Sequence, residues 1–216
     1  MNTQTSRSIA QKLLSGSILL LIAAYPLGLT LPSWWGFENQ PIENLQVALL
    51  VAGLAACAVF VRGPASVGRW FGLAAAPILL IIIGRELSWG AVFLEPTSVN
   101  EHGPRFSSQL LWYKPAVAPI VAGLIVFSGI VVVISGLPLR GIRLLKNGRA
   151  PIWSLMTTGL AMLVSTAAEG HVPLLPLNAY LSDNASQLIE ELFELAAYMA
   201  MLAGLLFIFA DLEEQD

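Results

Sequence analysis

Hydrophobic and charged positions alternate along this chain in long blocks rather than residue by residue. Six runs contain no Lys, Arg, Asp or Glu, and they extend over residues 13–37, 44–61, 70–84, 115–139, 150–168 and 195–210. A bilayer core about 30 Å thick is crossed by about 20 helical residues. Unbroken apolar runs favour helices over the alternating strands of a barrel. The pattern therefore predicts six transmembrane helices over residues 13–30, 45–62, 69–90, 115–136, 151–168 and 188–210.

Composition supports the same class. Charged residues make up 12% of the 216 positions and hydrophobic residues 56%, whereas soluble domains carry about 25% charged residues. A soluble domain of this size cannot bury so much apolar surface, and the single cysteine, Cys57, permits no internal disulfide. We therefore expect an all-α integral membrane protein with one domain over residues 1–216, rather than a cytosolic globule, a disordered chain or a disulfide scaffold.

The basic residues predict how the helices are oriented. Eight of the 11 fall on one side of the predicted spans, namely Arg7, Lys12, Arg62, Arg69, Arg140, Arg143, Lys146 and Arg149. The positive-inside rule places that side, and with it both termini, in the cytoplasm. The basic segment 139–149 either serves only as a topology determinant or also lies along anionic lipid headgroups. The first run has 25 uncharged residues, longer than a signal-peptide core, so we interpret it as a helix that is retained.

The segment over residues 91–114 is predicted to be an outer loop that ends in a short interfacial helix, SSQLLWY, over residues 107–113. Within this loop we expect His102 to be solvated. For the last helix, Asn184 and Gln187 provide a weak capping pattern at its start. Ser165 is expected to bond within its own helix, as serines in membrane helices usually do.

Several charged residues fall where a membrane helix should be apolar. Arg85 lies 15 residues after Trp70, about 22 Å along a helix, and Glu86 follows it. The same rise per residue places Glu169, Glu190 and Glu194 at a similar depth, near the outer boundary of the hydrocarbon. The candidate polar cluster therefore comprises one arginine and five glutamates, namely Arg85, Glu86, Glu169, Glu190, Glu191 and Glu194.

This imbalance is the main functional clue, because carboxylates in a membrane helix require cations, protons or a metal nearby. Three interpretations stay open. In the first, Arg85 holds a structural ion-pair network and the other acids reach outer water. In the second, a divalent metal binds at some of Glu86, Glu169, His171, Glu190 and Glu194. In the third, a carboxylate alternates its protonation and moves protons or cations.

The leading functional hypothesis is an inner-membrane protein whose outer-face cluster binds a cation, a polar lipid or a small molecule, with metal-assisted chemistry as one option. One alternative is a non-catalytic subunit or scaffold, and another is a small proton-coupled transporter. The pattern does not decide whether the protein is an enzyme. Expected partners are the lipid bilayer and other membrane subunits. A net charge of −3 gives no reason to expect nucleic acid.

The segment Gly84-Arg85-Glu86-Leu87-Ser88-Trp89-Gly90, with the later Glu190-Glu191-Leu192-Phe193-Glu194, resembles an uncharacterised group of small bacterial multi-pass membrane proteins. Ala91 stands where that group's pattern has a polar residue. The resemblance implies a bacterial inner-membrane location and a shared outer-face site at Glu86, Glu190 and Glu194. The alkaline ceramidase superfamily is excluded, because its zinc site needs an HxxxH pair and this chain has only His102 and His171.

Overall fold

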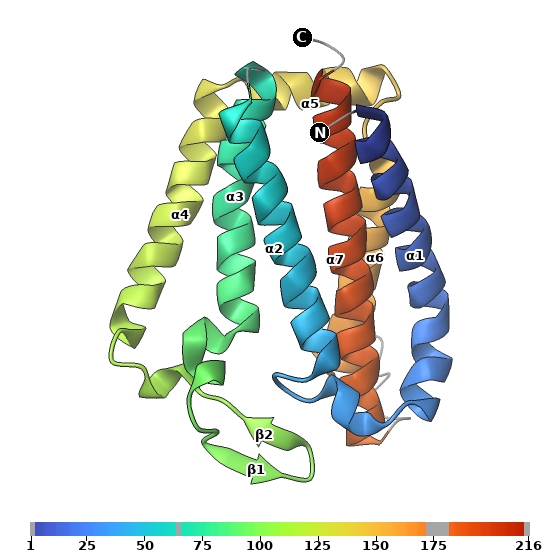
Figure 1. Cartoon of the computed structure of the whole chain (residues 1–216), viewed down its shortest axis with the longest axis vertical. Coiled ribbons are helices and arrows are strands. Elements are labelled where there is room, and N and C mark those ends of the chain that lie inside the picture. Colours follow the sequence, from blue (N-terminus) through green and yellow to red (C-terminus); the bar gives the residue numbers. More distant parts are fainter. Residues whose placement is uncertain (1–2, 64–65, 172–181, 214–216) are drawn as a thin grey trace.

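The computed structural model describes residues 3–63, 66–171 and 182–213, which fold mainly into helices (Figure 1). The α-helices are α1 (Thr3–Thr30), α2 (Pro41–Arg62), α3 (Ser66–Glu86), α4 (Lys114–Ile134), α5 (Leu137–Lys146), α6 (Ile152–Ala168) and α7 (Asp183–Glu213). The shorter elements are three 3-10 helices and one hairpin, namely η1 (Ser33–Gly36), η2 (Ser88–Phe93), η3 (Ser108–Leu110), β1 (Ser98–Asn100) and β2 (Gly103–Arg105). Within these described residues, five helices are long and apolar enough to cross a membrane, and α6 is a shorter apolar helix.

Helix α7 is the core of the bundle. It packs against α1, α6 and α2, while α3 packs on α2 and α4 packs on α3 (Figure 1). In its apolar stretch 72% of the residues are buried, against 17–33% in the other four long helices. The alanines of this helix explain the close packing, because small side chains let helices approach one another; Ala196, Ala197, Ala200 and Ala203 have no exposed surface.

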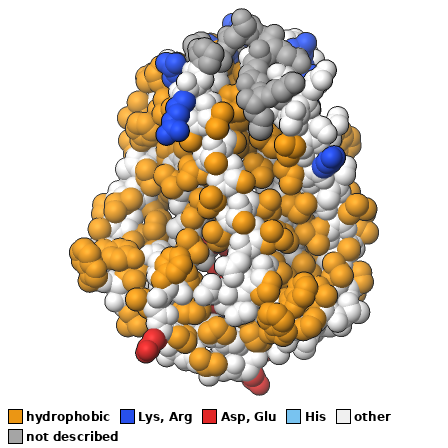
Figure 2. Space-filling model, viewed as in Figure 1, with side chains coloured by type: hydrophobic (Ala, Val, Ile, Leu, Met, Phe, Trp, Pro, Cys, Tyr) orange, Lys and Arg blue, Asp and Glu red, His pale blue; other side chains and the backbone are white. Residues whose placement is uncertain are grey.

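The two ends of the bundle differ in charge. At one end, which we call the basic end, α5 lies across the tops of the other helices, near the start of α1 and the end of α7 (Figure 1). The other end, which we call the acidic end, holds the β1–β2 hairpin and the start of α7. Figure 2 shows Lys and Arg near the first end, Asp and Glu at the second, and a hydrophobic belt between them. This arrangement agrees with the charge pattern along the chain.

The helix containing the predicted polar residues is shorter than expected. α3 ends at Glu86 rather than at residue 90, because the next residues have backbone angles that a helix does not accept. Ser88, Trp89 and Gly90 have φ values of 44°, 57° and 98°, the left-handed region that favours glycine. This turn brings the Trp89 ring back against Gly84, where a Cβ would lie 2.7 Å from the ring. Arg85 and Glu86 are therefore held at the very end of α3.

Other boundaries also differ from the prediction. The basic segment after α4 forms the separate helix α5, and the outer segment contains a hairpin that the sequence pattern did not indicate. The expected interfacial helix over residues 107–113 is reduced to the short η3. The last helix begins at Asp183 rather than at residue 188. Its cap is Ser182 instead of Asn184, because the side-chain oxygen of Ser182 accepts a hydrogen bond from the backbone N–H of Ala185.

Candidate functional site

The Arg85 side chain lies between two buried carboxylates. Its Nη2 is 2.9 Å from Oε1 of Glu194 on α7, and its Nε is 3.7 Å from Oε1 of the neighbouring Glu86. Glu86 is 7% exposed and Glu194 is 6% exposed, whereas 59% of the Arg85 side chain is exposed. Carboxylates taken out of water need such a partner, because an unpaired buried charge is costly.

Two further side chains complete this group. The Tyr198 hydroxyl donates a hydrogen bond of 2.7 Å to Oε1 of Glu86, and Ser165 on α6 lies 3.4 Å from Oε1 of Glu194. We call Arg85, Glu86, Ser165, Glu194 and Tyr198 the Arg85 network. The expectation that Ser165 bonds only within its helix was wrong, because α6 packs closely enough on α7 to bring its hydroxyl to the carboxylate. Tyr198 was not identified from the sequence, although its position one turn after Glu194 places both on one face of α7.

Glu191 lies on another side of α7 and contacts α2. The side-chain amide of Gln46 donates to the Glu191 carbonyl oxygen and to its Oε2, both at 2.9 Å. Gln46 is completely buried, and its Oε1 has no hydrogen-bond partner among the described residues. The sequence pattern did not single out Gln46. An amide within an apolar run does indicate a hydrogen-bonded contact between helices, because buried polar groups usually have partners.

Glu169 and His171 lie apart from Arg85. Both side chains are exposed, and Nδ1 of His171 is 2.8 Å from Oε2 of Glu169. Glu169 follows the end of α6, whereas Arg85 lies in the last turn of α3, and these two helices lie on different sides of α7. The predicted cluster is therefore divided into two neighbouring groups rather than gathered around one point.

The second group surrounds a cavity of about 460 Å³ at the acidic end. We call this cavity the acidic pocket. Five carboxylate residues contribute to its lining, together with one arginine and one histidine, and the full set is Glu38, His102, Arg105, Ala168, Glu169, Asp183, Ser186, Gln187, Glu190 and Glu191. Because carboxylates outnumber the bases, the pocket favours a positively charged ligand.

The outer loop helps to shape this pocket. Nη1 of Arg105 is 3.7 Å from Oε1 of Glu38, whose other oxygen accepts a 2.8 Å hydrogen bond from the backbone N–H of Phe106. Nδ1 of His102 is 2.7 Å from Oδ1 of Asn184 on α7. The expectation of a solvated His102 was therefore wrong, because the hairpin folds back onto the start of α7. Only the tertiary structure brings these loop residues to the helix.

Within residues 3–63, 66–171 and 182–213, no three His, Cys, Asp or Glu side chains are placed to hold a metal ion. The expected ligands Glu86 and Glu194 belong to the Arg85 network, where the guanidinium lies against both. Glu169, Glu190 and His171 lie at or beside the acidic pocket instead. A divalent ion needs oxygen ligands that converge within about 2.0–2.6 Å of one point, and these side chains are divided between two places.

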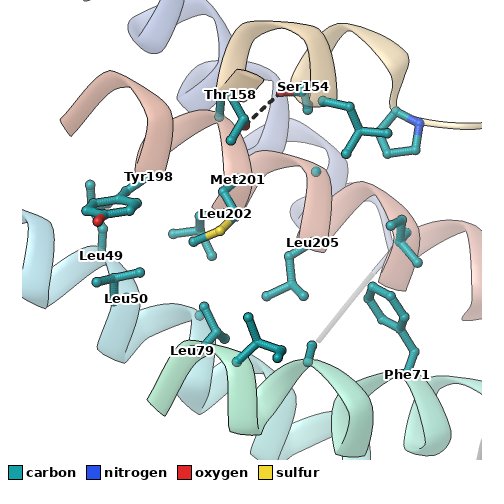
Figure 3. A pocket seen from close by; sticks show the side chains of 18 residues that line it. Leu49, Leu50, Phe71, Leu79, Ser154, Thr158, Tyr198, Met201, Leu202 and Leu205 are labelled. Atoms are coloured by element: carbon teal, nitrogen blue, oxygen red, sulfur yellow. Dashed lines mark hydrogen bonds between the residues drawn. The ribbon is translucent and has the colours of Figure 1, made fainter. Parts of the chain in front are cut away.

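On the other side of Tyr198 lies an apolar cavity of about 260 Å³, which we call the inner cavity. Figure 3 shows Tyr198 at one end of it, Leu79 of α3 on one side and Ser154 and Thr158 of α6 on the other. Tyr198 is the one ionisable residue in its lining. The Arg85 network thus borders a region without carboxylates or bases.

Comparison with known proteins adds no family to this description. No protein-family model matches the chain, and neither a curated protein nor a solved structure matches it.

Proposed function

We propose that α6 also crosses the membrane, which gives six spans with both termini on the basic side. With 17 residues, α6 would rise about 25 Å, near the lower limit for a membrane helix, and it packs alongside α7 (Figure 1). The positive-inside rule then places the basic end in the cytoplasm and the acidic end outside. The location in a bacterial inner membrane rests on the resemblance of the segments that contain Arg85 and Glu194.

We propose that the protein binds a small organic cation in the acidic pocket. The observation that carries this proposal is the excess of negative charge around a cavity of about 460 Å³, where five carboxylate residues face one arginine. A cavity of this size is within the range of small-molecule sites, about 300–1,000 Å³. Ammonium groups donate several hydrogen bonds and carry the charge that such a lining requires.

The spacing of the carboxylates favours an organic amine over a metal ion. A metal needs ligands gathered around one point, whereas the described acids are distributed around the pocket. An amine with two or more charged nitrogens can contact separate carboxylates at once. In this proposal the Arg85 network is not the binding site. It fastens α3 and α6 to α7 and thereby fixes the position of Glu190 and Glu191 on α7.

The alternative of a purely structural protein is favoured by one observation, the position of Arg85 between Glu86 and Glu194. It accounts for those two acids and not for the excess of carboxylates around the acidic pocket. The transporter alternative has less support, because the described residues that line the inner cavity include no carboxylate or base that could relay charge beyond Tyr198. We therefore favour binding over transport.

The proposal is tested by titrating the full-length protein in neutral detergent with spermidine and measuring binding by isothermal calorimetry. We expect saturable binding that weakens at high salt, because salt screens the charges. Glu190→Gln should raise the Kd by about tenfold, since one charge-assisted hydrogen bond contributes about 1.5 kcal/mol or more. The matched control is Glu95→Gln, which removes an exposed acid outside the pocket and should leave the Kd unchanged.

Three results would contradict the proposal. The first is the absence of saturable binding by the wild-type protein. The second is an equal loss of spermidine affinity in Glu190→Gln and Glu95→Gln, which would mean that spermidine is attracted only by the overall charge of the protein. The third is tighter binding of Mg²⁺ or Ca²⁺ than of spermidine, with the same dependence on Glu190. That result would identify the ligand of the acidic pocket as a metal ion instead of an organic cation.

A further inference from the structure

A second hollow, at the opposite end of the molecule, is lined by arginines. It has a volume of about 500 Å³ and is formed by Arg140, Arg143, Leu144, Asn147, Arg149 and Leu212. We call it the arginine pocket. Its polar groups all come from α5 and the turn that follows, so their positions depend on how α5 lies across the basic end (Figure 1).

An apolar cavity continues from the arginine pocket into the bundle. This cavity of about 370 Å³, which we call the α5 cavity, shares Arg140, Leu144 and Leu212 with the arginine pocket. It also shares Phe71, Ala75 and Ile208 with the inner cavity, which extends toward Tyr198. Because neighbouring cavities share lining residues, the three are adjacent, and together they run from a cationic mouth into an apolar interior.

The arginines at the mouth have no carboxylate partner within the part of the chain that the structure describes. The side chains of Arg140, Arg143 and Arg149 form no hydrogen bond or ion pair there. Asp211, which precedes Leu212 of the arginine pocket, is instead bound to Arg7 at 2.5 Å. Three guanidinium groups with free donors suit a phosphate, because the planar fork of arginine matches phosphate oxygens.

We propose that these three cavities bind one anionic phospholipid, with its phosphate at Arg140, Arg143 and Arg149 and an acyl chain in the α5 cavity and the inner cavity. The charge at the mouth and the apolar lining behind it match the two parts of such a molecule. Leu144, buried on α5, separates the two environments and would lie beside the glycerol region. This site is independent of the acidic pocket, which lies at the other end of the bundle.

One buried hydroxyl lines the inner cavity. Ser154 lines the inner cavity in the first turn of α6, is 1% exposed, and its Oγ has no partner among the described residues. A buried donor without an acceptor is unfavourable. This hydroxyl lies in the inner cavity, where the proposal places the acyl chain, so it takes no part in recognising the phosphate or the glycerol.

The test measures lipid binding to the full-length protein in neutral detergent by native mass spectrometry and by thermal stabilisation. Phosphatidylglycerol is compared with phosphatidylcholine and with free glycerol phosphate. We expect saturable binding of phosphatidylglycerol, weaker binding of phosphatidylcholine, and little stabilisation by glycerol phosphate, since that molecule lacks the acyl chains. Replacing Arg140, Arg143 and Arg149 together by Gln should weaken phosphatidylglycerol binding about a hundredfold.

Two controls separate this site from general attraction to the basic end. The variant in which Lys12, Arg62 and Lys146 are replaced by Gln loses the same charge outside the arginine pocket, and its phosphatidylglycerol binding should fall by less than threefold. Ala75→Phe keeps the charge and fills the junction of the α5 cavity and the inner cavity, so it should weaken binding at least tenfold.

Each of the following results would overturn the proposal. Equal losses in the two triple variants would mean that only net charge matters. Equal stabilisation by glycerol phosphate and by phosphatidylglycerol would mean a simple anion site. Unchanged phosphatidylglycerol binding in Ala75→Phe would mean that the acyl chain lies elsewhere. Equal binding of phosphatidylcholine and phosphatidylglycerol would mean that the arginines do not select an anionic headgroup.

Discussion

The Arg85 network at the acidic end and the arginine pocket at the basic end handle charge in opposite ways. At the acidic end the carboxylates of Glu86 and Glu194 are buried and each has a partner in the Arg85 network. At the basic end the α5 arginines border open hollows and have no described partner. A charge buried inside this bundle is satisfied by the protein itself, whereas a charge at its boundary is open to water or a ligand.

The two ends also differ in packing. At the acidic end, Gly36 of η1 lies against the backbone of Leu188, so closely that a Cβ there would be 2.8 Å from the Leu188 Cα. At the basic end, a Cβ on Gly141 of α5 would have nothing within 4 Å. The chain is therefore packed tightly between η1 and the start of α7, and openly around this position of α5.

The largest expected effect comes from removing the cation that the buried carboxylates share. Arg85→Gln should lower the free energy of unfolding by about 3 kcal/mol, because Glu86 and Glu194 would remain buried without it. Thermal unfolding in detergent, followed by tryptophan fluorescence, measures this loss. Arg105→Gln, at a 3.7 Å ion pair in the exposed loop, is the control and should cost about 0.5 kcal/mol or less.

The double variant Arg85→Gln with Glu194→Gln distinguishes pairing from simple loss of packing. It should recover part of the stability lost in Arg85→Gln, since the unpaired carboxylate is then gone. If the two losses simply add, the charges do not interact and the contrast between the two ends fails.

An intermediate effect is expected from adding one methyl group at each end. Gly36→Ala should destabilise the protein by about 2 kcal/mol, because Leu188 backbone atoms cannot move aside easily. Gly141→Ala, which has open space around its Cβ, should be neutral or stabilising by up to about 1 kcal/mol through helix propensity. Chemical unfolding of the two variants side by side gives the comparison. Equal destabilisation would show that the basic end is as closely packed as the acidic end.

The smallest expected effect comes from two hydroxyl groups beside the inner cavity. Tyr198→Phe should cost about 1.5 kcal/mol, because Glu86 loses a charge-assisted hydrogen bond. Ser154→Ala should change stability by about 0.5 kcal/mol or less in lipid-free detergent, since its hydroxyl has no partner to lose. The same unfolding assay applies. A larger cost for Ser154→Ala than for Tyr198→Phe would contradict the described hydrogen bonds.

Much of the fold follows from the sequence, because long apolar helices are selected by the bilayer itself. The centres of the long helices and the grouping of basic residues at one end were predicted by hydropathy and charge alone. The end of α3 was missed, since the left-handed turn at Ser88, Trp89 and Gly90 depends on how Trp89 packs on Gly84. The helix α5 was missed because its arginines break the apolar pattern on which spans are recognised.

The sequence singled out several of the polar residues described above, but not how they are arranged around α7. Arg85, Glu86 and Glu194 do come together, as their depths along the helices indicated. Depth says nothing about which side of α7 a residue faces, so the separation of Glu191 and Glu169 from Arg85 could not be deduced. His102 and Glu38 joined the acidic pocket through loop folding, which has no periodic signal in the sequence.

The class of protein, the long apolar spans and the unequal distribution of charge can be deduced from the sequence alone, because each follows from the cost of placing polar groups in hydrocarbon. The packing of the helices in three dimensions sets which carboxylates share Arg85, which line the acidic pocket, and which arginines have no partner among the described residues. These outcomes depend on how each helix is rotated about its axis and which helices touch α7. The reason is that a hydrogen bond or an ion pair forms only where packing brings its two atoms within about 3–4 Å.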